Sequence, residues 1–353
     1  MADNKATSKA QEFKALSKKD QQRKIGDLIL NNAMYIIIAI AIIFITVKQP
    51  KFISLSSIVN IISPTAAKLP IALGIGGCIV LTGTDISAGR VVGLAACISA
   101  SLLTTVFKVF PNMTSAMPIP VVLLIVLGVG AAVGFVNGFS VAKFKLHPFI
   151  VTLSTQLITY GIILMYLMNG VNNGQTLSGL TDSYRSPITG TLFTIGGVAI
   201  PRYVLYAVIP TAVMWVIWNK TTFGKNMFAV GSNEEAANVS GVNVARTIIL
   251  VFMLAGVMYG ITGFFDGARI ASANANTGLN YECDAIAACV IGGVSFVGGI
   301  GRISGIVVGV LLLQIIFAGL NFLSVDPNML YIIKGLIILV ACAIDMRKYL
   351  VRK

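Results

Sequence analysis

The sequence has very few charged residues, and this scarcity argues against most classes of soluble protein. Only 11% of the 353 residues are Asp, Glu, Lys or Arg, against about 25% in a typical soluble domain. Hydrophobic residues make up 56% of the chain and the mean hydropathy is +0.87. Because this number of charges is too small to cover a water-facing surface, a soluble enzyme is disfavoured.

Motifs for metals, disulfides and bond-making chemistry are also missing. His147 is the only histidine, and the five cysteines show no CxxC spacing, so we expect no metal site, no disulfide framework and no cofactor. The chain has no GxxxxGK[ST], GxSxG or HExxH motif, which are the signatures of a phosphate-binding loop, a nucleophile elbow and a zinc protease. We therefore expect no catalytic residues and predict that the protein is not an enzyme.

Acidic residues are few: 13 Asp and Glu stand against 26 Lys and Arg, for a net charge of +13. In a soluble protein this balance would suggest a nucleic-acid partner. Here the basic residues lie beside apolar runs, which indicates the positive-inside bias of membrane proteins and no nucleic acid.

Long apolar runs are what the sequence does contain. They are continuous rather than alternating, which favours a helical membrane protein over a β-barrel, with lipid as its surroundings. The predicted fold is all-α and polytopic, with about ten transmembrane helices at 29–47, 56–81, 86–107, 118–142, 147–168, 203–218, 247–266, 284–298, 303–322 and 329–345. Broken or re-entrant helices are expected in the second, third and eighth spans, which Ser63-Pro64, residues 68–70, residues 83–85 and Gly292-Gly293 interrupt.

Ten spans place both termini on one side of the membrane, and the basic residues identify that side. Segments 1–28, 143–146, 219–246 and 346–353 carry 16 Lys and Arg, whereas the segments on the other side carry six. Both termini are therefore predicted to be cytoplasmic. The expected organisation is a basic extension (1–28) that is not a cleavable signal peptide, a transmembrane domain (29–346) and a basic tail (347–353).

A weak internal repeat accompanies this organisation. A GxxxGxxxG pattern occurs at residues 130–138 in the fourth span and at residues 301–309 at the start of the ninth. These would be the fourth helices of two five-helix halves, and halves with an odd number of spans are inverted relative to each other. Close packing of helices through small residues explains the same glycines without a repeat.

The polar loop 219–246 contains a short helix whose ends can be read from the sequence. Ser232 is a candidate N-cap and Glu235 completes a capping box, while Gly241 is a terminator. A two-turn helix held on the cytoplasmic face suits the docking of a partner; an ordinary solvated loop is the alternative. The docking residues expected are Ser232, Asn233, Glu234, Glu235, Ala236, Ala237 and Gly241.

Charged residues between apolar runs are the other candidates for function. Asp85 needs a partner or water, since a charge at the bilayer centre costs about 2.5–3.5 kcal/mol. Arg90 is the nearest candidate partner; capping of the following helix and contact with a transported solute are alternatives. Asp284 precedes an expected helix, and Lys334 is expected to snorkel outward. The candidate pathway or gating residues are thus Asp85, Arg90 and Asp284.

Five stretches of the sequence are similar to motifs of a known protein family. They are GTDISAGRVVGLAA (83–96), PFIVTL (148–153), WNKTTFGKN (218–226), EAANVSGVNV (235–244) and DAIAACVIGGVSF (284–296). From about residue 30 onward, the chain resembles the membrane permease subunits of the ribose/galactose-type sugar ATP-binding-cassette importers.

The resemblance implies a set of partners and a location. These are a second permease copy in a homodimer, a duplicated ATP-binding subunit, an extracytoplasmic sugar-binding protein and the bacterial cytoplasmic (inner) membrane. It implies a monosaccharide substrate, and the pattern at Thr84 and 88–90 favours galactose or a methyl-galactoside over ribose. The helix at 232–241 would then be the coupling helix that contacts the ATPase.

Two other classes of transporter remain open. A secondary sugar transporter driven by H⁺ or Na⁺ would need a titrating carboxylate in the pathway, for which Asp85, Asp266 or Asp284 could serve. A passive channel would need neither a coupling helix nor an ATPase.

Overall fold

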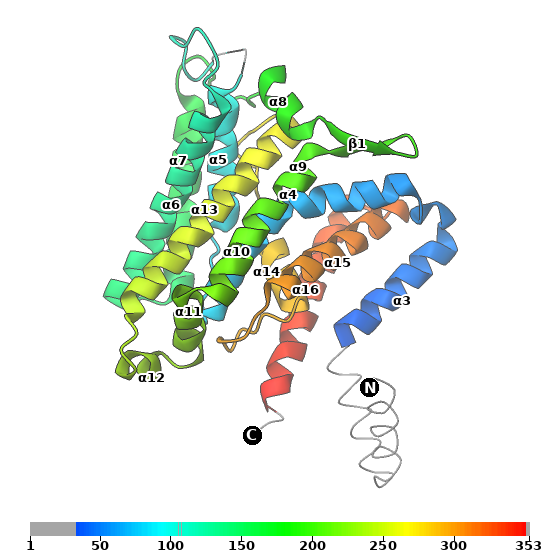
Figure 1. The fold of residues 1–353 in the computed structure, drawn as a ribbon. Coiled ribbons are helices and arrows are strands. Elements are labelled where there is room, and N and C mark those ends of the chain that lie inside the picture. Colours follow the sequence, from blue (N-terminus) through cyan, green and yellow to red (C-terminus); the bar gives the residue numbers. More distant parts are fainter. Residues whose placement is uncertain (1–32, 105, 107, 351–353) are drawn as a thin grey trace.

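The computed structural model describes residues 33–104, 106 and 108–350 (Figure 1). The extension predicted at 1–28 and the last three residues of the predicted tail lie outside this part. The elements are α3 (Ala33–Lys48), η1 (Pro50–Phe52), α4 (Leu55–Val80), α5 (Ala88–Leu102), α6 (Ile119–Phe144), α7 (Pro148–Met168), α8 (Asp182–Thr189), β1 (Thr191–Ile195), β2 (Val198–Pro201), α9 (Arg202–Tyr206), α10 (Val208–Lys220), α11 (Thr222–Ser232), α12 (Glu234–Val239), α13 (Val244–Ile270), α14 (Tyr281–Ile291), α15 (Ile303–Phe322) and α16 (Pro327–Leu350).

Five helices in the described part are long and apolar enough to cross a membrane: α4, α6, α7, α13 and α15. A sixth span is possible if the bent pair formed by residues 202–220 and α11 is counted as one. The chain is therefore a mostly helical, multi-pass membrane protein. The count of ten spans stays a prediction, because α5 and α14 are only 15 and 11 residues long.

The expected break in the second span is wrong. α4 is one continuous helix of 26 residues, with Pro64 and Pro70 in its interior. Each proline removes one backbone hydrogen bond, but packing against neighbouring helices can hold a membrane helix through such positions. α4 packs against α13, α14 and α15, and most of its residues are buried.

The breaks expected in the third and eighth spans are present. Non-helical residues separate α4 from α5, which begins only at Ala88. α14 ends at Ile291, and Gly293 follows with a φ of +82°, a conformation open to glycine at little cost. Both short helices are surrounded by longer ones, as irregular backbone at membrane depth requires.

α13 lies at the centre of the packing and contacts α4, α5 and α6 (Figure 1). Glycines let α6 and α13 approach closely: a Cβ at Gly130 would collide with the carbonyl oxygen of Gly256, and one at Gly134 with that of Phe252. Small residues at such crossings allow the backbones to touch, which is how membrane helices gain packing energy.

The structure also contains elements that the sequence did not predict. β1 and β2 form an antiparallel hairpin whose turn residues, Gly196 and Gly197, have φ values of +53° and +82°, as a two-residue type I′ turn requires. The all-α prediction is therefore wrong in this detail. The hairpin and α8 lie at one end of the molecule, and α12 lies at the opposite end, toward which α16 runs (Figure 1).

Residues 219–246 contain more helix than predicted. α11 precedes the expected short helix and is bent by 70° from the helix pair at residues 202–220. Thr221 caps α11, with its side chain accepting from the backbone N–H of Gly224 at 3.1 Å. The segment is a helical corner that carries α12 between α11 and α13.

Candidate functional site

α12 is a short helix with a defined start. Its N-cap is Asn233, whose Oδ1 accepts a hydrogen bond from the backbone N–H of Ala236 at 2.9 Å. The predicted capping box of Ser232 and Glu235 is wrong: Ser232 is the last residue of α11, and its hydroxyl donates to the carbonyl oxygen of Phe228. An Asx side chain caps as well as a Ser side chain, so the sequence left the register open by one residue.

The end of α12 is as well defined as its start. The N–H of Val242 donates to the carbonyl of Ala237, and the N–H of Gly241 to that of Asn238, both at 3.0 Å. Gly241 has a φ of +84°. This pair of bonds is a Schellman motif with a left-handed residue after the helix, so the predicted terminator role of Gly241 is confirmed.

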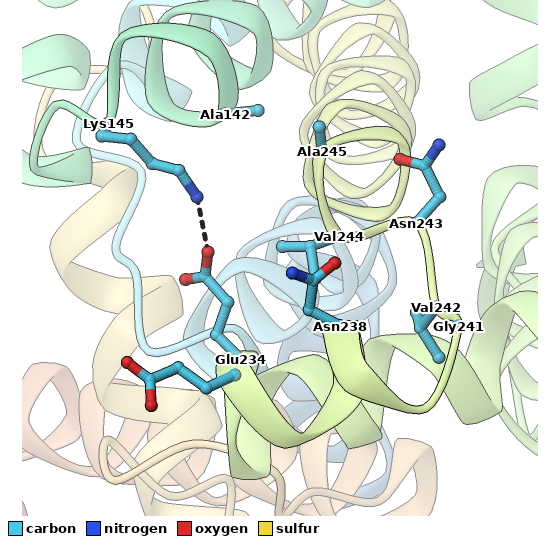
Figure 2. A pocket seen from close by; sticks show the side chains of 10 residues that line it. Ala142, Lys145, Glu234, Asn238, Gly241, Val242, Asn243, Val244 and Ala245 are labelled. Atoms are coloured by element: carbon cyan, nitrogen blue, oxygen red, sulfur yellow. Dashed lines mark hydrogen bonds and ion pairs between the residues drawn. The ribbon is translucent and has the colours of Figure 1, made fainter.

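α12 presents nearly all of its side chains to the outside. Only Ala237 is buried, and Val239 is 90% exposed. Glu234 pairs with Lys145, the residue that follows α6, at 2.6 Å. A cleft of about 720 Å³ separates α12 from the ends of α6 and α13, and Lys145, Glu234, Asn238 and Asn243 face it (Figure 2). The helix is therefore fixed at its ends and open along its length.

The corner that carries α12 touches the interior of the molecule. A Cβ at Gly231, near the end of α11, would collide with the carbonyl oxygen of Val80 at the end of α4. The same carbonyl accepts the N–H of Gly299, in the loop between α14 and α15, at 2.9 Å. Three segments far apart in sequence thus meet beside α12.

Asp85 lies in a fully buried hydrogen-bond network. Its Oδ1 accepts from the backbone N–H and the hydroxyl of Ser87 at 3.0 and 2.6 Å, and its Oδ2 accepts from the hydroxyl of Tyr259 at 3.2 Å. Asn137 donates to the Ser87 hydroxyl and accepts from Thr155. The network ties the segment before α5 to α6, α7 and α13, and it meets the need of a buried polar group for partners.

Arg90 does not pair with Asp85, so that expected pairing is wrong. Its guanidinium donates to the carbonyl oxygen of Ala275 at 2.9 Å and lies 4.2 Å from the ring centroid of Tyr160. Hydroxyl donors closer to Asp85 take the place of the cation.

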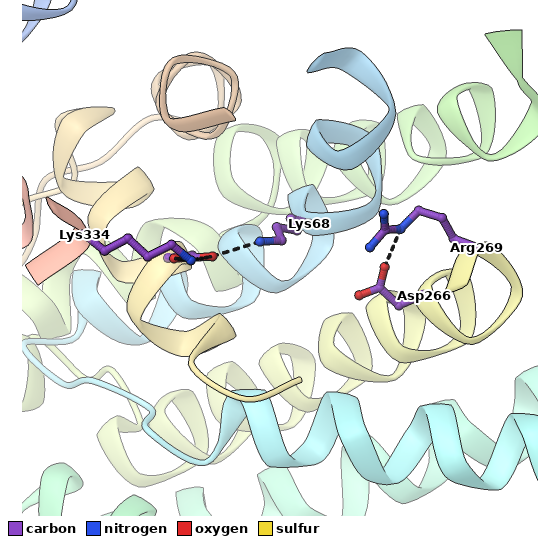
Figure 3. A network of polar contacts seen from close by, with 5 residues as sticks. Lys68, Asp266, Arg269 and Lys334 are labelled. Atoms are coloured by element: carbon purple, nitrogen blue, oxygen red, sulfur yellow. Dashed lines mark hydrogen bonds and ion pairs between the residues drawn. The ribbon is translucent and has the colours of Figure 1, made fainter. Parts of the chain in front are cut away.

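Asp284 is shared between two lysines from different helices. Lys68 of α4 approaches its Oδ2 to 2.8 Å, and Lys334 of α16 approaches its Oδ1 to 3.0 Å (Figure 3). The prediction that Lys334 snorkels outward is wrong, because a buried carboxylate lies within reach and pairing is favoured inside a membrane. A second pair, Asp266 with Arg269 at 2.7 Å, lies on α13.

Sequence analysis missed several members of these clusters. Tyr259, Asn137 and Thr155 lie on helices that carry other polar residues as well, so nothing in the sequence singled them out. Lys68 was noted only as a helix interruption. The usable signal was that a polar residue inside a membrane span needs a partner, although the partner's identity depends on the packing.

The described residues define a multi-pass helical membrane protein with buried ionic clusters and an exposed, capped helix at one end. A model of the family described as "branched-chain amino acid transport system / permease component" matches residues 57–342. The chain belongs to this permease family, whose members are transport subunits.

Several named relatives align with nearly the whole chain. A galactose/methyl galactoside import permease protein of Haemophilus influenzae is 43% identical over 336 residues, which is 94% of this chain and 99% of the relative. The protein of the same name from Salmonella typhimurium is 45% identical over 323 residues, 91% of this chain and 95% of its own. The ribose import permease protein of Haemophilus influenzae is 34% identical over 322 residues, which is 91% of this chain and 95% of the relative. No solved structure matches the chain.

Proposed function

We propose that the chain is the translocating subunit of an ATP-binding-cassette importer for a monosaccharide, galactose or a methyl-galactoside. The sugar follows from the relatives: those named for galactose are 43–45% identical, and the one named for ribose is 34% identical. The ATP is hydrolysed by a separate duplicated subunit. An extracytoplasmic binding protein delivers the sugar, and the whole assembly lies in the bacterial inner membrane.

The geometry of α12 is the observation that supports ATP hydrolysis by a partner subunit as the energy source. Its start is held by Asn233 and its end by the Schellman motif at Gly241, while Val239 stands 90% exposed between them. A fixed, exposed helix is the shape needed to transmit motion from a partner by rigid docking. We assign Ser232 to Ala237 and Gly241 to this coupling contact with the ATPase.

The contact at Val80 gives the coupling helix a route to the membrane domain. Movement of α12 displaces the end of α11, which touches the end of α4 and the loop at Gly299. Those segments lead to α5 and α14, the two short helices at the centre of the fold. We propose Arg90 and Asp284, near the starts of these helices, as groups close to the pathway, and assign Asp85 to the packing that holds the start of α5.

We propose ten spans with cytoplasmic termini, arranged as an inverted repeat of two five-helix halves. With α3–α7 as one half and α10 with α13–α16 as the other, α4 is equivalent to α13, α5 to α14 and α6 to α15. α6 packs on α13 as α15 packs on α4, and α5 packs on α13 as α14 packs on α4. Reciprocal packing of this kind is what a pseudo-twofold axis in the membrane plane produces.

The energy source can be tested by reconstitution. In vesicles that contain two copies of this chain, the duplicated ATPase and the sugar-binding protein, galactose should accumulate only with ATP inside. The chain alone should not accumulate galactose under an imposed proton or sodium gradient. Gradient-driven accumulation by the isolated chain would instead establish a secondary transporter.

A further inference from the structure

The segment between α13 and α14 runs deep into the membrane domain without helical structure. After α13 ends, the chain turns back along α5. The thiol of Cys97 contacts the carbonyl oxygen of Asn274, and Arg90 donates to that of Ala275. Farther along, a Cβ at Gly89 would collide with the carbonyl oxygen of Gly278. The segment therefore follows α5 from Cys97 to Gly89, a descent of about 12 Å at 1.5 Å per residue.

This descent reaches the middle of the membrane. α13 is 27 residues long, so its midpoint is near Val257. Gly263 of α13 lies against Val92 of α5, and the two helices run in the same direction, so the start of α5 is almost level with that midpoint. α14 thus begins close to the midplane of a hydrocarbon core about 30 Å thick.

Polar groups of this segment are exposed at that depth. Asn276 is exposed and Asn280 is partly exposed, and the apolar Leu279 beside them is 41% exposed. Within the described part of the chain, the side-chain amides of Asn276 and Asn280 make no hydrogen bond. Irregular backbone with free amides cannot face lipid, and at membrane depth it occurs where it is buried in protein or lines a water-filled cavity. This face is uncovered in the single chain, so it borders either the second permease copy or an aqueous space.

The first turn of α14 also borders a small cavity of about 10 Å³, which has room for about one water molecule. Because a monosaccharide is larger than that, a sugar reaches the groups around this cavity only when α14 moves away from α4 and α15. Lys68, Tyr281, Asp284 and Gln314 line the cavity, between α4, α14 and α15. Gln314 is only 6% exposed, and its Nε2 has no hydrogen-bond partner among the described residues. An amide donor buried without a partner costs free energy unless a ligand or water satisfies it.

The charges at this place are also unbalanced. One carboxylate, Asp284, serves the two ammonium groups of Lys68 and Lys334, which are 16% and 24% exposed (Figure 3). Lys68 lies 4.6 Å from the centroid of the Tyr281 ring. The cluster keeps donor capacity for the oxygens of an uncharged, hydroxyl-rich ligand, and an aromatic ring supplies an apolar face.

We propose that the start of α14 is a sugar-contacting site of the translocation pathway. At this site the hydroxyl groups of the passing monosaccharide form hydrogen bonds with the side chains of Asn276, Asn280, Gln314, Lys68 and Asp284. This inference rests on the proposed function as an importer. The positive end of a half-helix at the midplane is a favourable place for the electronegative oxygens of a substrate.

Thiol labelling tests whether the segment borders water. In a variant whose five native cysteines are replaced by serine or alanine, Asn276→Cys should react with a hydrophilic thiol reagent much faster than Ile158→Cys. Ile158 is 61% exposed on the apolar surface of α7 and serves as the lipid-facing control. Galactose with its binding protein and ATP should slow the reaction at residue 276. Equal, slow labelling at both sites, or labelling that galactose leaves unchanged, would overturn the proposal.

Sugar selectivity provides a second test that does not need the cysteine-free background. In the complete importer, Asn276→Ala and Gln314→Leu should each lower the rate of ATP-dependent galactose uptake at limiting sugar about fivefold, the equivalent of one hydrogen bond of about 1 kcal/mol. They should also change the ratio of galactose to methyl-galactoside uptake, which a structural role would not move. Gln156→Leu on α7 is the matched control and should keep both values.

The two proposals fail in different ways. If the wild-type complex shows no ATP-dependent uptake, the importer assignment is wrong. If the wild type transports sugar and Asn276→Ala and Gln314→Leu keep its selectivity and its rate of uptake, the importer assignment stands and the proposed sugar-contacting site is wrong.

Discussion

Gly241 is the residue on which the shape of the coupling helix depends most directly. Its φ of +84° is unfavourable for residues with a Cβ, by about 1–2 kcal/mol. No atom lies within 4 Å of a Cβ built at this position. A substitution there acts through backbone strain alone, without a steric clash.

Gly241→Val should therefore distort the end of α12 and weaken docking of the ATPase. Gly241→Asn is the control, because asparagine tolerates the left-handed conformation. The measurements are co-purification of the ATPase and stimulation of ATP hydrolysis by sugar-loaded binding protein. The coupling assignment is wrong if the valine variant retains both at the wild-type level.

Tyr259 tests the buried network around Asp85. Tyr259→Phe removes the donor to Asp85 Oδ2, and an unsatisfied buried acceptor costs about 1–3 kcal/mol. The thermal midpoint of the purified protein should fall. Tyr160→Phe keeps the ring beneath Arg90 and should have little effect; equal midpoints for the two variants would contradict the structural role of the network.

At the scale of elements, the contact between α6 and α13 organises the fold. Gly134→Val should force the two helices apart, because a Cβ there meets the backbone of Phe252. Overpacking of this kind typically costs about 1–3 kcal/mol. Gly128 lies on the same helix with no atom within 4 Å of an added Cβ, so Gly128→Val is the matched control. Thermal unfolding in detergent should separate the two variants, and comparable stability would argue against this helix contact.

The two short helices explain where the membrane domain can change shape. α5 and α14 are joined to their neighbours by non-helical segments, so each can shift without bending a long helix. The end of α4, which precedes α5, and the loop that follows α14 contact α11, which carries α12. Motion at the coupling helix can therefore reach the segments that precede α5 and follow α14 through backbone contacts.

At the scale of the whole molecule, the orientation can be measured in intact cells. An impermeant thiol reagent should label Asn112→Cys, which precedes α6 at the end opposite α12, and should not label Ser232→Cys until the membrane is permeabilised. The expected reason is the excess of basic residues on the cytoplasmic side. Labelling of residue 232 from outside would reverse the orientation.

Local sequence was sufficient to predict the class of protein and several element ends. Continuous apolar runs predicted membrane helices, and α6, α7, α13 and α15 follow the predicted spans closely. Gly292-Gly293 and Gly241 predicted helix ends correctly, because the conformational freedom of glycine acts at its own position. The resemblance carried by short motifs predicted the permease family.

Only the tertiary structure decided which charged and polar groups meet. Lys68 and Asp284 are 216 residues apart in sequence, so their pairing depends on how α4 and α14 pack. The same holds for Tyr259 as the partner of Asp85, and for the continuity of α4 through its prolines. A span's apolar character is a local property, whereas the partner of a buried charge is whichever group the packing brings within about 3 Å. That is why the membrane class could be read from the chain and the polar interior could not.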